Sequence, residues 1–455
     1  MPGELKLITP VRKDSGMPRR LTVLGAGYLG ATHAACMAEL GFDVLALDAD
    51  ASHVADLAAG RLPLYESGLE ELLNRGLRSG RLRFTTSYAE AADFGDVHFV
   101  CVGTPQLKGS AGADLSQVFG CIDSLAPLLK RPCLIVGKST TPAGTAAVLA
   151  ERVARLAPVG AAAELAWNPE FLREGFAVAD TLRPERIVAG VRSAAAESVL
   201  REVYAEPIEA GVPFVVTDYA TAELIKVAAN AFLATKISFI NAMAEICEAA
   251  DANVIKLAEA LAYDHRIGGA SMRPGLGFGG GCLPKDLRAF VTRAEELGAG
   301  EAVSFLRQVD QINTRRRTRM VELARELAGG SLRGKSVGVL GLAFKPDSDD
   351  IRDSPALDVA ATISRLGARV TSYDPAAMDR ARKAHPELEY AGSVIDAAAG
   401  ADVLLLLTEW PEFREADPEV IGKAVAQRRV ADGRHALDPA LWRAAGWTYR
   451  ALGRP

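Results

Sequence analysis

The order of apolar segments, glycines and one acid between residues 20 and 48 restricts the possible folds more than any other feature. An apolar strand is expected at Arg20–Leu24, and the letters GAGYLG follow it. An apolar-periodic helix is then expected over Ala31–Leu40, and a second strand over Asp43–Leu47 ends in Asp48. Strand, G-x-G-x-x-G, helix, strand and an acid about 20 residues later is the pattern of a dinucleotide-binding unit.

Each residue of this pattern has a physical reason in such a unit. Gly25 makes the tight turn, Gly27 admits the pyrophosphate, and Gly30 lets the helix pack on the strand. The N–H groups at the helix N-terminus would hold the phosphates. Asp48 would bind the ribose hydroxyls and repel a 2′-phosphate, so the pattern favours NAD over NADP.

Two further expected strands end in small polar residues and a proline. The strand Val97–Val102 runs into GTP, and the strand Cys133–Val136 runs into GKSTTP. Ligands bind at the carboxyl edge of parallel sheets, so we place Thr104 and Thr140 at a binding edge. Either threonine could also cap a helix N-terminus.

The letters NPEFLREG at residues 168–175 carry two carboxylates four residues apart, Glu170 and Glu174. In a helix they would share one face with Arg173 beside them. A solvated amphipathic turn explains the same pattern, so the segment alone indicates no chemistry.

A long helix is expected from Asp218 to about Asn253, where there is little glycine or proline. Lys226 and Asn230 are four residues apart and therefore share a face among largely apolar neighbours. Buried lysine is rare unless it is paired or functional. A helix of this length is suited to join two α/β halves and to form a dimer contact.

A glycine-rich loop follows at residues 275–281, with five glycines in seven positions. Such a run allows a backbone to pass close to a ligand. If a helix begins at Cys282, then Cys282 and Asp286 share one face of it. A thiol at a helix N-terminus is expected to be more acidic and more nucleophilic. A flexible loop with Cys282 as a small apolar side chain is the alternative.

A second α/β pattern begins after a helical stretch over Arg288–Gly330. Strands are expected at Lys335–Leu340, Arg369–Tyr373 and Asp402–Leu407, but the first turn lacks the full glycine fingerprint. The sequence therefore predicts an α/β fold with two Rossmann-like doubly wound domains, joined by a long central helix and a helical middle domain. The expected domains are an NAD-binding domain at 19–212, a central domain at 213–325 and a second Rossmann-like domain at 326–455, which binds a nucleotide differently or binds a different nucleotide.

Composition excludes several functional classes. The net charge of -5 gives no electrostatic footprint for nucleic acid. No apolar run is expected to span a membrane. Six scattered cysteines without a C-x-x-C pair, and histidines without ligand spacing, predict no metal site and a cytoplasmic protein. Residues 1–20 lack an apolar signal core, so we expect a disordered tail, with Met17 as an alternative start.

From about Arg20 to Asp438 the chain resembles the UDP-glucose/GDP-mannose dehydrogenase family. The segments that carry the resemblance are GAGYLG, GTP, KSTTPAGT, NPEFLREG, ELIKVAANAFLATKISFIN, DHRIG, GFGGGCLPKD, AFKPDSDDIRDSP and DGR, in this order. The resemblance implies oxidation of a nucleotide-sugar primary alcohol to a carboxylate with two NAD per turnover. It implies a homodimer through the central helix.

The resemblance also assigns catalytic roles. Cys282 would trap the intermediate aldehyde as a thiohemiacetal and then carry a thioester that water cleaves. Lys226 and Asn230 would stabilise oxyanions. Asp286 and Thr140 would orient the water together with Lys226, and Glu170 would be the general base. These residues form the predicted catalytic set: Cys282, Lys226, Asn230, Asp286, Glu170 and Thr140.

Binding residues follow from the same motifs. The residues implied for NAD are Gly25, Gly27, Tyr28, Leu29, Gly30, Asp48, Thr104, Thr140, Glu174 and Arg352. The residues implied for the nucleotide sugar are Glu170, Phe171, Leu172, Lys226, Asn230, Arg266, Gly275, Phe278, Gly279, Phe344, Lys345 and Arg434. Arg266 would reach into the neighbouring subunit's site.

Three positions depart from the family pattern: Gly281 stands where Ser is usual, Ser67 where Pro is usual, and Thr141 where Val is common. The letters RPERIV and DHRIG favour UDP-glucose as the substrate and UDP-glucuronate as the product. The letters SMRP are also compatible with GDP-mannose enzymes, and an N-acetylated UDP sugar is a further alternative. A simpler hydroxyacid dehydrogenase would need no loop cysteine, and a catalytically silent NAD or sugar sensor would need no thiol.

Overall fold

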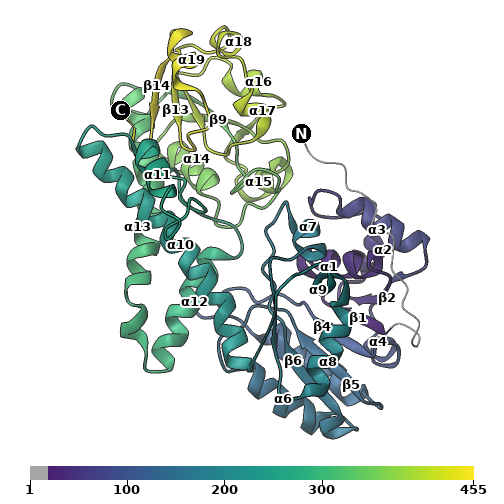
Figure 1. Cartoon of the computed structure of the whole chain (residues 1–455). Coiled ribbons are helices and arrows are strands. Elements are labelled where there is room, and N and C mark those ends of the chain that lie inside the picture. Colours follow the sequence, from purple (N-terminus) through teal and green to yellow (C-terminus); the bar gives the residue numbers. More distant parts are fainter. Residues whose placement is uncertain (1–18, 455) are drawn as a thin grey trace. The chain divides into compact units, whose positions relative to one another are not determined.

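The computed structural model describes residues 19–454, and the expected N-terminal tail and the start at Met17 lie outside them. The described chain forms two compact units (Figure 1). The first unit contains residues 19–108 and Ala113–Lys226, and the second contains Gly109–Gly112 and residues 227–454. Their boundary falls inside one long helix, α10 (Tyr219–Ala249).

The first unit contains an eight-stranded sheet in the order β3-β2-β1-β4-β5-β6-β7-β8 among the described residues. Neighbouring strands run parallel except at one antiparallel bridge, Trp167 to Gly190, between β6 and β7. The strand order reverses between β1 and β4, which is where ligands bind in such sheets. The strands are β1 (Arg20–Leu24), β2 (Asp43–Leu47), β3 (Leu82–Thr85), β4 (Val97–Val100), β5 (Cys133–Gly137), β6 (Ala163–Trp167), β7 (Ile187–Gly190) and β8 (Phe214–Thr217).

Helices cover both faces of this sheet. Successive side chains of a strand point to opposite faces, and β5 shows it: Leu134 and Val136 belong to one apolar cluster, and Ile135 to another. The first cluster includes side chains of α1 (Tyr28–Glu39), α3 (Leu69–Arg78), α7 (Ala177–Leu182) and α8 (Ala194–Val203). The second includes side chains of α4 (Tyr88–Phe94), α5 (Ser116–Leu125), α6 (Thr145–Leu156) and α10. The remaining helices are α2 (Ala51–Ala58) and α9 (Ala205–Glu209).

Two local expectations were wrong. The first helix begins at Tyr28 rather than Ala31, because Gly27 already acts as its N-cap and accepts the Ala31 N–H at 2.8 Å. Residues 168–176 form no helix, so Glu170 and Glu174 do not share a helical face. The Leu172 N–H bonds to Glu170 Oε2 at 2.6 Å instead, which holds the segment as an irregular turn.

The helical middle of the chain is more divided than expected. The predicted stretch over Arg288–Gly330 is two helices, α12 (Leu283–Glu296) and α13 (Phe305–Leu327), separated by a 3-10 turn. A shorter helix, α11 (Val254–Ala262), follows α10.

Helix α10 corrects the expectation that no apolar run could span a membrane. It contains 31 residues, and an 18-residue window reaches a mean hydropathy of 1.3. Polar side chains inside it are nevertheless buried within the protein. Ser238 Oγ donates to the Val309 carbonyl at 2.8 Å, and Asn241 Oδ1 accepts the Gly275 N–H at 2.8 Å. We therefore interpret α10 as a core helix.

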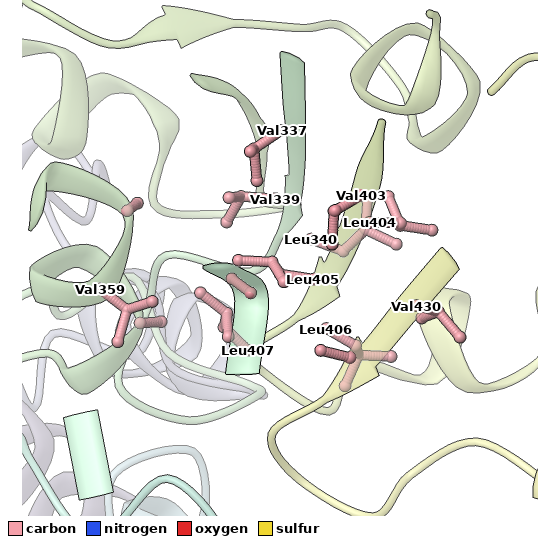
Figure 2. Close-up of a cluster of buried hydrophobic side chains, with 14 of the residues drawn as sticks. Val337, Val339, Leu340, Val359, Val403, Leu404, Leu405, Leu406, Leu407 and Val430 are labelled. Atoms are coloured by element: carbon pink, nitrogen blue, oxygen red, sulfur yellow. The ribbon is translucent and has the colours of Figure 1, made fainter. Parts of the chain in front are cut away.

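The second unit contains a six-stranded parallel sheet in the order β11-β10-β9-β12-β13-β14 among the described residues. Figure 2 shows its apolar core, where Val337 and Val339 of one strand lie among Val403–Leu407 and Val430. The strands are β9 (Ser336–Leu340), β10 (Arg369–Tyr373), β11 (Glu389–Tyr390), β12 (Val403–Leu406), β13 (Arg429–Asp432) and β14 (Thr448–Ala451). The helices are α14 (Pro355–Arg365), α15 (Met378–Ala384), α16 (Val394–Ala398), α17 (Pro411–Arg414), α18 (Pro418–Gly422) and α19 (Pro439–Ala444). The prediction of an α/β fold with two Rossmann-like parts and a helical middle is confirmed.

Candidate active site

The glycine loop of the first unit has the space that a pyrophosphate needs. A Cβ at Gly30 would lie 1.7 Å from the Gly25 carbonyl oxygen, so only glycine fits where the helix packs on the turn. A Cβ at Gly27 would meet no atom within 4 Å, so this position opens outward. Asp48 Oδ2 accepts the Ala26 N–H at 2.8 Å, which fixes the carboxylate beside the loop. The residues present fit a dinucleotide.

Tyr28 connects the same loop to the turn after residue 173. Its hydroxyl donates to Glu66, which is 6% exposed. Glu66 also accepts the N–H groups of Gly175 at 2.6 Å and Ala177 at 2.8 Å. Burial, followed by the hydrogen bond to Glu66, raises the pKa of Tyr28. Glu66 was not predicted from the sequence, and it holds Glu174's turn next to the cofactor loop.

Thr104 and Thr140 follow the carboxyl ends of β4 and β5. Thr104 is buried and Thr140 is half-buried. The neighbouring Thr141 is buried and donates to Glu223 Oε1 at 3.0 Å. Glu223 comes from α10 and also accepts two backbone N–H groups of the Thr140 loop. The departure at Thr141 therefore has a structural partner, and Thr140 is held between anchored neighbours.

Glu170 and Lys226 form a buried ion pair. The Lys226 Nζ lies 2.8 Å from Glu170 Oε1, and the two side chains are only 5% and 12% exposed, respectively. Burial raises the pKa of Glu170, but the charge and hydrogen bond of Lys226 and the Leu172 N–H hold it below its ordinary value. Phe171 lies beside this pair, with its ring centroid 5.6 Å from the Lys226 Nζ. This cluster joins a proposed base to a proposed oxyanion donor.

The predicted catalytic thiol, Cys282 of the second unit, lies at a helix N-terminus. Cys282 is the N-cap of α12 and is exposed, and its carbonyl accepts the Asp286 N–H at 2.9 Å. All six cysteines are thiols. Asn230 Nδ2 donates to Asp286 Oδ2 at 2.8 Å, and Lys285 Nζ lies 2.5 Å from Asp286 Oδ1. The second unit therefore brings Cys282, Asp286 and Asn230 onto neighbouring turns of two helices.

Two asparagines that the sequence reading missed hold the glycine-rich loop. Asn241 Oδ1 accepts the Gly275 N–H at 2.8 Å. Asn313 closes a pair of bonds with Phe278, accepting its N–H at 2.8 Å and donating to its carbonyl at 2.9 Å. Gly277 has φ +95°, and a Cβ there would lie 2.3 Å from Asn313 Oδ1. The loop is fixed, so the alternative of a flexible loop before α12 is not supported.

Arg434, predicted to bind the nucleotide sugar, is buried and ties three segments together. Its guanidinium donates to the carbonyls of Leu407 at 2.9 Å, Gly277 at 2.9 Å and Phe344 at 3.2 Å. Burial lowers its pKa. Arg434 therefore shapes the loop that carries Gly275, Phe278 and Gly279.

The acid that directly follows β10 is held by hydrogen bonds within the protein. Asp374 occupies the position that Asp48 occupies in the first sheet, since each follows the strand next to the central one. Asp374 is 1% exposed and accepts five hydrogen bonds, from the N–H groups of Leu342, Ala343, Ala376 and Ala377 and from Trp410 Nε1. Asp48 is half-buried and can still accept bonds from a ribose.

Three predicted binding residues extend from the second unit. Arg352 pairs with Asp350 at 2.7 Å, and its guanidinium lies where a Cβ at Gly281 would be, 2.3 Å from Cζ. The absence of a side chain at Gly281 thus lets Arg352 lie against the residue before Cys282. The Arg266 side chain is 80% exposed and pairs with Asp264 at 2.6 Å. Lys345 Nζ lies 5.5 Å from the Phe344 ring centroid. No group of three potential metal ligands occurs in residues 19–454.

The predicted site residues thus fall into two groups, one in each unit. The first unit holds Gly25, Gly27, Tyr28, Leu29, Gly30, Asp48, Thr104, Thr140, Glu170, Phe171, Leu172, Glu174 and Lys226. The second unit holds Asn230, Arg266, Gly275, Phe278, Gly279, Cys282, Asp286, Phe344, Lys345, Arg352 and Arg434. Helix α10 carries residues of both groups, with Lys226 and Asn230 one turn apart.

Comparison with known proteins gives matches over nearly the whole chain. Models of the UDP-glucose/GDP-mannose dehydrogenase family match in order: the NAD-binding domain at residues 19–208, the central domain at 220–315 and the UDP-binding domain at 338–439. The UDP-glucose 6-dehydrogenase of Rhizobium meliloti is 40% identical over 96% of this chain and 100% of that protein.

Solved structures of nucleotide-sugar dehydrogenases are similar to this chain over nearly its full length. A UDP-glucose dehydrogenase from Pyrobaculum islandicum has a TM-score of 0.89 at 37% identity, covering 98% of this chain and 100% of that one. A UDP-D-ManNAc dehydrogenase from Pyrococcus horikoshii has a TM-score of 0.83 at 26% identity, covering 96% and 99%.

Proposed function

The chain belongs to the UDP-glucose/GDP-mannose dehydrogenase family of NAD-dependent oxidoreductases, and on that premise we propose that it oxidises UDP-glucose to UDP-glucuronate. The observation that carries the four-electron reaction is the position of Cys282, exposed at the N-terminus of α12 and one turn before the buried Asp286. A two-electron dehydrogenase needs no such thiol. Relatives that are 40% and 39% identical over nearly the full length are named UDP-glucose 6-dehydrogenases, which supports UDP-glucose as the substrate.

NAD, when bound, supplies the acceptor for each of the two hydrides. The Gly25–Gly30 loop would receive its pyrophosphate, because Gly27 opens outward and the α1 N-terminus presents N–H groups. Asp48 would bind the ribose hydroxyls. Thr104, Thr140, Glu174 and Arg352 complete the proposed cofactor set, with Tyr28 and Leu29 in the loop itself.

Cys282 forms the covalent intermediates. The first oxidation converts the C6 alcohol to an aldehyde. The Cys282 thiolate then adds to the carbonyl carbon, and the resulting oxyanion takes a proton to give a thiohemiacetal. Loss of a hydride from that carbon and of the hydroxyl proton gives a thioester. Water attacks the thioester, the carbon–sulfur bond breaks, and the thiolate leaves with the carboxylate product released.

The other polar side chains serve the same steps. Lys226 and Asn230 are the oxyanion donors, which are worth most in a dry site. Glu170 accepts the proton of the attacking water, because it is held as a carboxylate by Lys226. Asp286 and Thr140 orient that water together with Lys226.

The residues that we assign to nucleotide-sugar binding are given for each unit separately. From the first unit we assign Glu170, Phe171, Leu172 and Lys226. From the second we assign Asn230, Arg266, Gly275, Phe278, Gly279, Phe344, Lys345 and Arg434. Arg434 would act through the loop that it anchors as well as on the ligand. We further propose a division into residues 19–212, 213–325 and 326–455, for NAD, the central helices and the UDP sugar.

A homodimer through α10 is part of this proposal. Phe232, Phe239 and Ile246 are 66%, 47% and 57% exposed, and they recur every seven residues, so they form one apolar stripe along the helix. A second copy of the stripe would cover it, and the exposed Arg266 would then reach the partner's site. We assign the protein to the cytoplasm, because its six cysteines are thiols, as is usual in a reducing compartment.

Substrate choice is tested by comparing kcat/KM for UDP-glucose, GDP-mannose and a UDP-N-acetyl sugar with the same preparation. We expect UDP-glucose to exceed the others by at least about 100-fold, since a site built to hydrogen-bond one ligand strongly disfavours analogues that leave its polar groups unpaired. Equal or higher kcat/KM with GDP-mannose would overturn the substrate assignment. No turnover with any of the three sugars would instead support a catalytically silent sensor.

A further inference from the structure

A buried lysine contacts the segment that carries the proposed base, Glu170. Lys138 follows β5 and is 8% exposed. Its Nζ donates to Asn168 Oδ1 at 2.9 Å and lies 3.2 Å from the Tyr204 hydroxyl. No carboxylate within residues 19–454 lies within ion-pair distance of it. A buried cation is costly unless some charge or dipole offsets it, so Lys138 calls for an explanation that the reaction steps above do not give.

The partners of Lys138 lead directly to Glu170. Asn168 directly follows β6 and is two residues before Glu170. Its backbone N–H bonds to the Gly137 carbonyl at 2.8 Å, and its side-chain amide donates to the Val188 carbonyl at 2.7 Å. The Tyr204 hydroxyl donates to the same Asn168 Oδ1 at 2.6 Å. Lys138 and Tyr204 therefore fix the chain at the point where it turns to present Glu170.

The charges around Glu170 come from three elements. Lys226 of α10 lies 2.8 Å away, the Leu172 N–H belongs to the same loop, and Lys138 acts from the end of β5. The Cys101 thiol, after β4, is buried and has its pKa raised to about 12 by burial. It is therefore neutral near pH 7. Lys138 is thus a second cation that acts on Glu170, from an element other than α10.

We propose that Lys138 is a positioning residue for the reaction: held by Asn168 and Tyr204, it fixes the turn that carries Glu170 and places a positive charge at the base of that turn. The kinetic consequence rests on the proposed role of Glu170 in thioester hydrolysis. The effect on the charge of Glu170 does not, because it follows from the arrangement within the first unit.

The test is a pH titration of Glu170 by infrared spectroscopy on the full-length protein. The protonated carboxyl band of Glu170 is identified as the one missing from Glu170→Gln. In Lys138→Met we expect its midpoint to move up by about 0.5 to 1 pH unit, because an opposite charge is removed. Tyr204→Phe is the matched control, since it removes a hydrogen bond to the same Asn168 without removing charge, and its midpoint should stay near that of the wild type.

Two further variants keep the proposal testable if the methionine variant does not fold, as judged by thermal unfolding. Lys138→Gln removes the charge but can still donate to Asn168, and should shift the midpoint in the same direction. Lys138→Arg restores the charge and should return it toward the wild-type value. An unchanged midpoint in the neutral variants, or an equal shift in Tyr204→Phe, would overturn the proposal.

Kinetics separate this inference from the proposed function. If Glu170 is the base, the acidic limb of the kcat profile should move with the infrared midpoint in Lys138→Met. A shifted infrared midpoint with an unmoved acidic limb would support the role of Lys138 and contradict the role of Glu170. An unmoved infrared midpoint in an active enzyme would contradict the role of Lys138 and leave the proposed role of Glu170 unaffected.

Discussion

Asn230 donates a hydrogen bond from Nδ2 to Asp286 Oδ2 over 2.8 Å, and both side chains are buried although they are 56 residues apart in the chain. The other oxygen of Asp286 faces Lys285. Both carboxylate oxygens are thus engaged, which fixes Asp286 one turn after Cys282. A carboxylate held in this way stays in place while it orients a water toward the carbonyl carbon of the proposed Cys282 thioester.

Asp286→Asn tests this arrangement. The amide retains the shape but removes the charge that holds Asn230 and Lys285, so we expect kcat to fall by about 100-fold with a smaller change in KM for UDP-glucose. Asp379→Asn is the control, because Asp379 pairs with Arg382 at the surface. Similar small losses in both variants would remove Asp286 from the reaction.

Cys282→Ser should retain binding of both ligands and lose steady-state oxidation to the acid. A serine hydroxyl is a far weaker nucleophile than a thiolate, so neither the hemiacetal adduct nor the ester forms at a useful rate. Binding is checked by calorimetry, and turnover by NADH absorbance. Cys133→Ser, at a half-buried cysteine in the first unit, should turn over normally. Wild-type rates in Cys282→Ser would rule out the thioester route.

Asp48→Asn should weaken NAD selectively. The amide offers one acceptor and a donor where two ribose hydroxyls need acceptors, so we expect the Kd for NAD to rise by about 10-fold, or about 1.4 kcal/mol. UDP-glucose affinity should not change. Asp50→Asn is the matched control, since Asp50 caps α2 two residues away. An unchanged Kd in Asp48→Asn would place the ribose elsewhere.

The buried pair of Glu170 and Lys226 predicts a pH-dependent stability. The pKa of Glu170 lies below its ordinary value of 4.5, so its stabilising contribution is complete above that pH and is lost as the pH falls through the lower folded-state pKa. Glu170→Gln leaves Lys226 buried without its partner, and we expect a loss of about 3 kcal/mol at pH 7.

Urea unfolding at several pH values checks this prediction. The stability difference between wild type and Glu170→Gln should be constant between pH 6 and 7, a range chosen well above the ordinary glutamate pKa of 4.5. It should narrow as the pH falls below about 4.5, because the carboxyl of the unfolded wild-type chain is then protonated while that of the folded protein is still ionised. A difference that stays the same down to pH 3 would contradict the assigned pKa direction.

Much of the fold and many of the chemical groups could be predicted because their signals are local in the sequence. The spacing from Gly25 to Asp48 specifies a βαβ unit, and the four-residue spacing of Lys226 and Asn230 places both on one helical face. Cys282 and Asp286 were placed one turn apart by the same argument. The four-residue spacing of Glu170 and Glu174 was only compatible with a helix, and the segment instead forms an irregular turn in which Glu170 accepts the Leu172 N–H.

The remaining residues depend on contacts between distant parts of the chain. Glu66 reaches Gly175 across 109 residues, and Asn313 reaches Phe278 across 35. Asp374 follows its strand just as Asp48 does, so the sequence cannot show that five donors converge on it. Only the packed structure shows which polar side chains form all their hydrogen bonds within the protein and which can still bind ligands.

The most direct test of the account is the number of NADH molecules released for each UDP-glucose consumed by the wild-type enzyme, with the product identified by mass spectrometry. We expect two NADH for each UDP-glucose, with UDP-glucuronate as the product, because Cys282 retains the aldehyde until the second oxidation. One NADH for each sugar, with an aldehyde product, would contradict it.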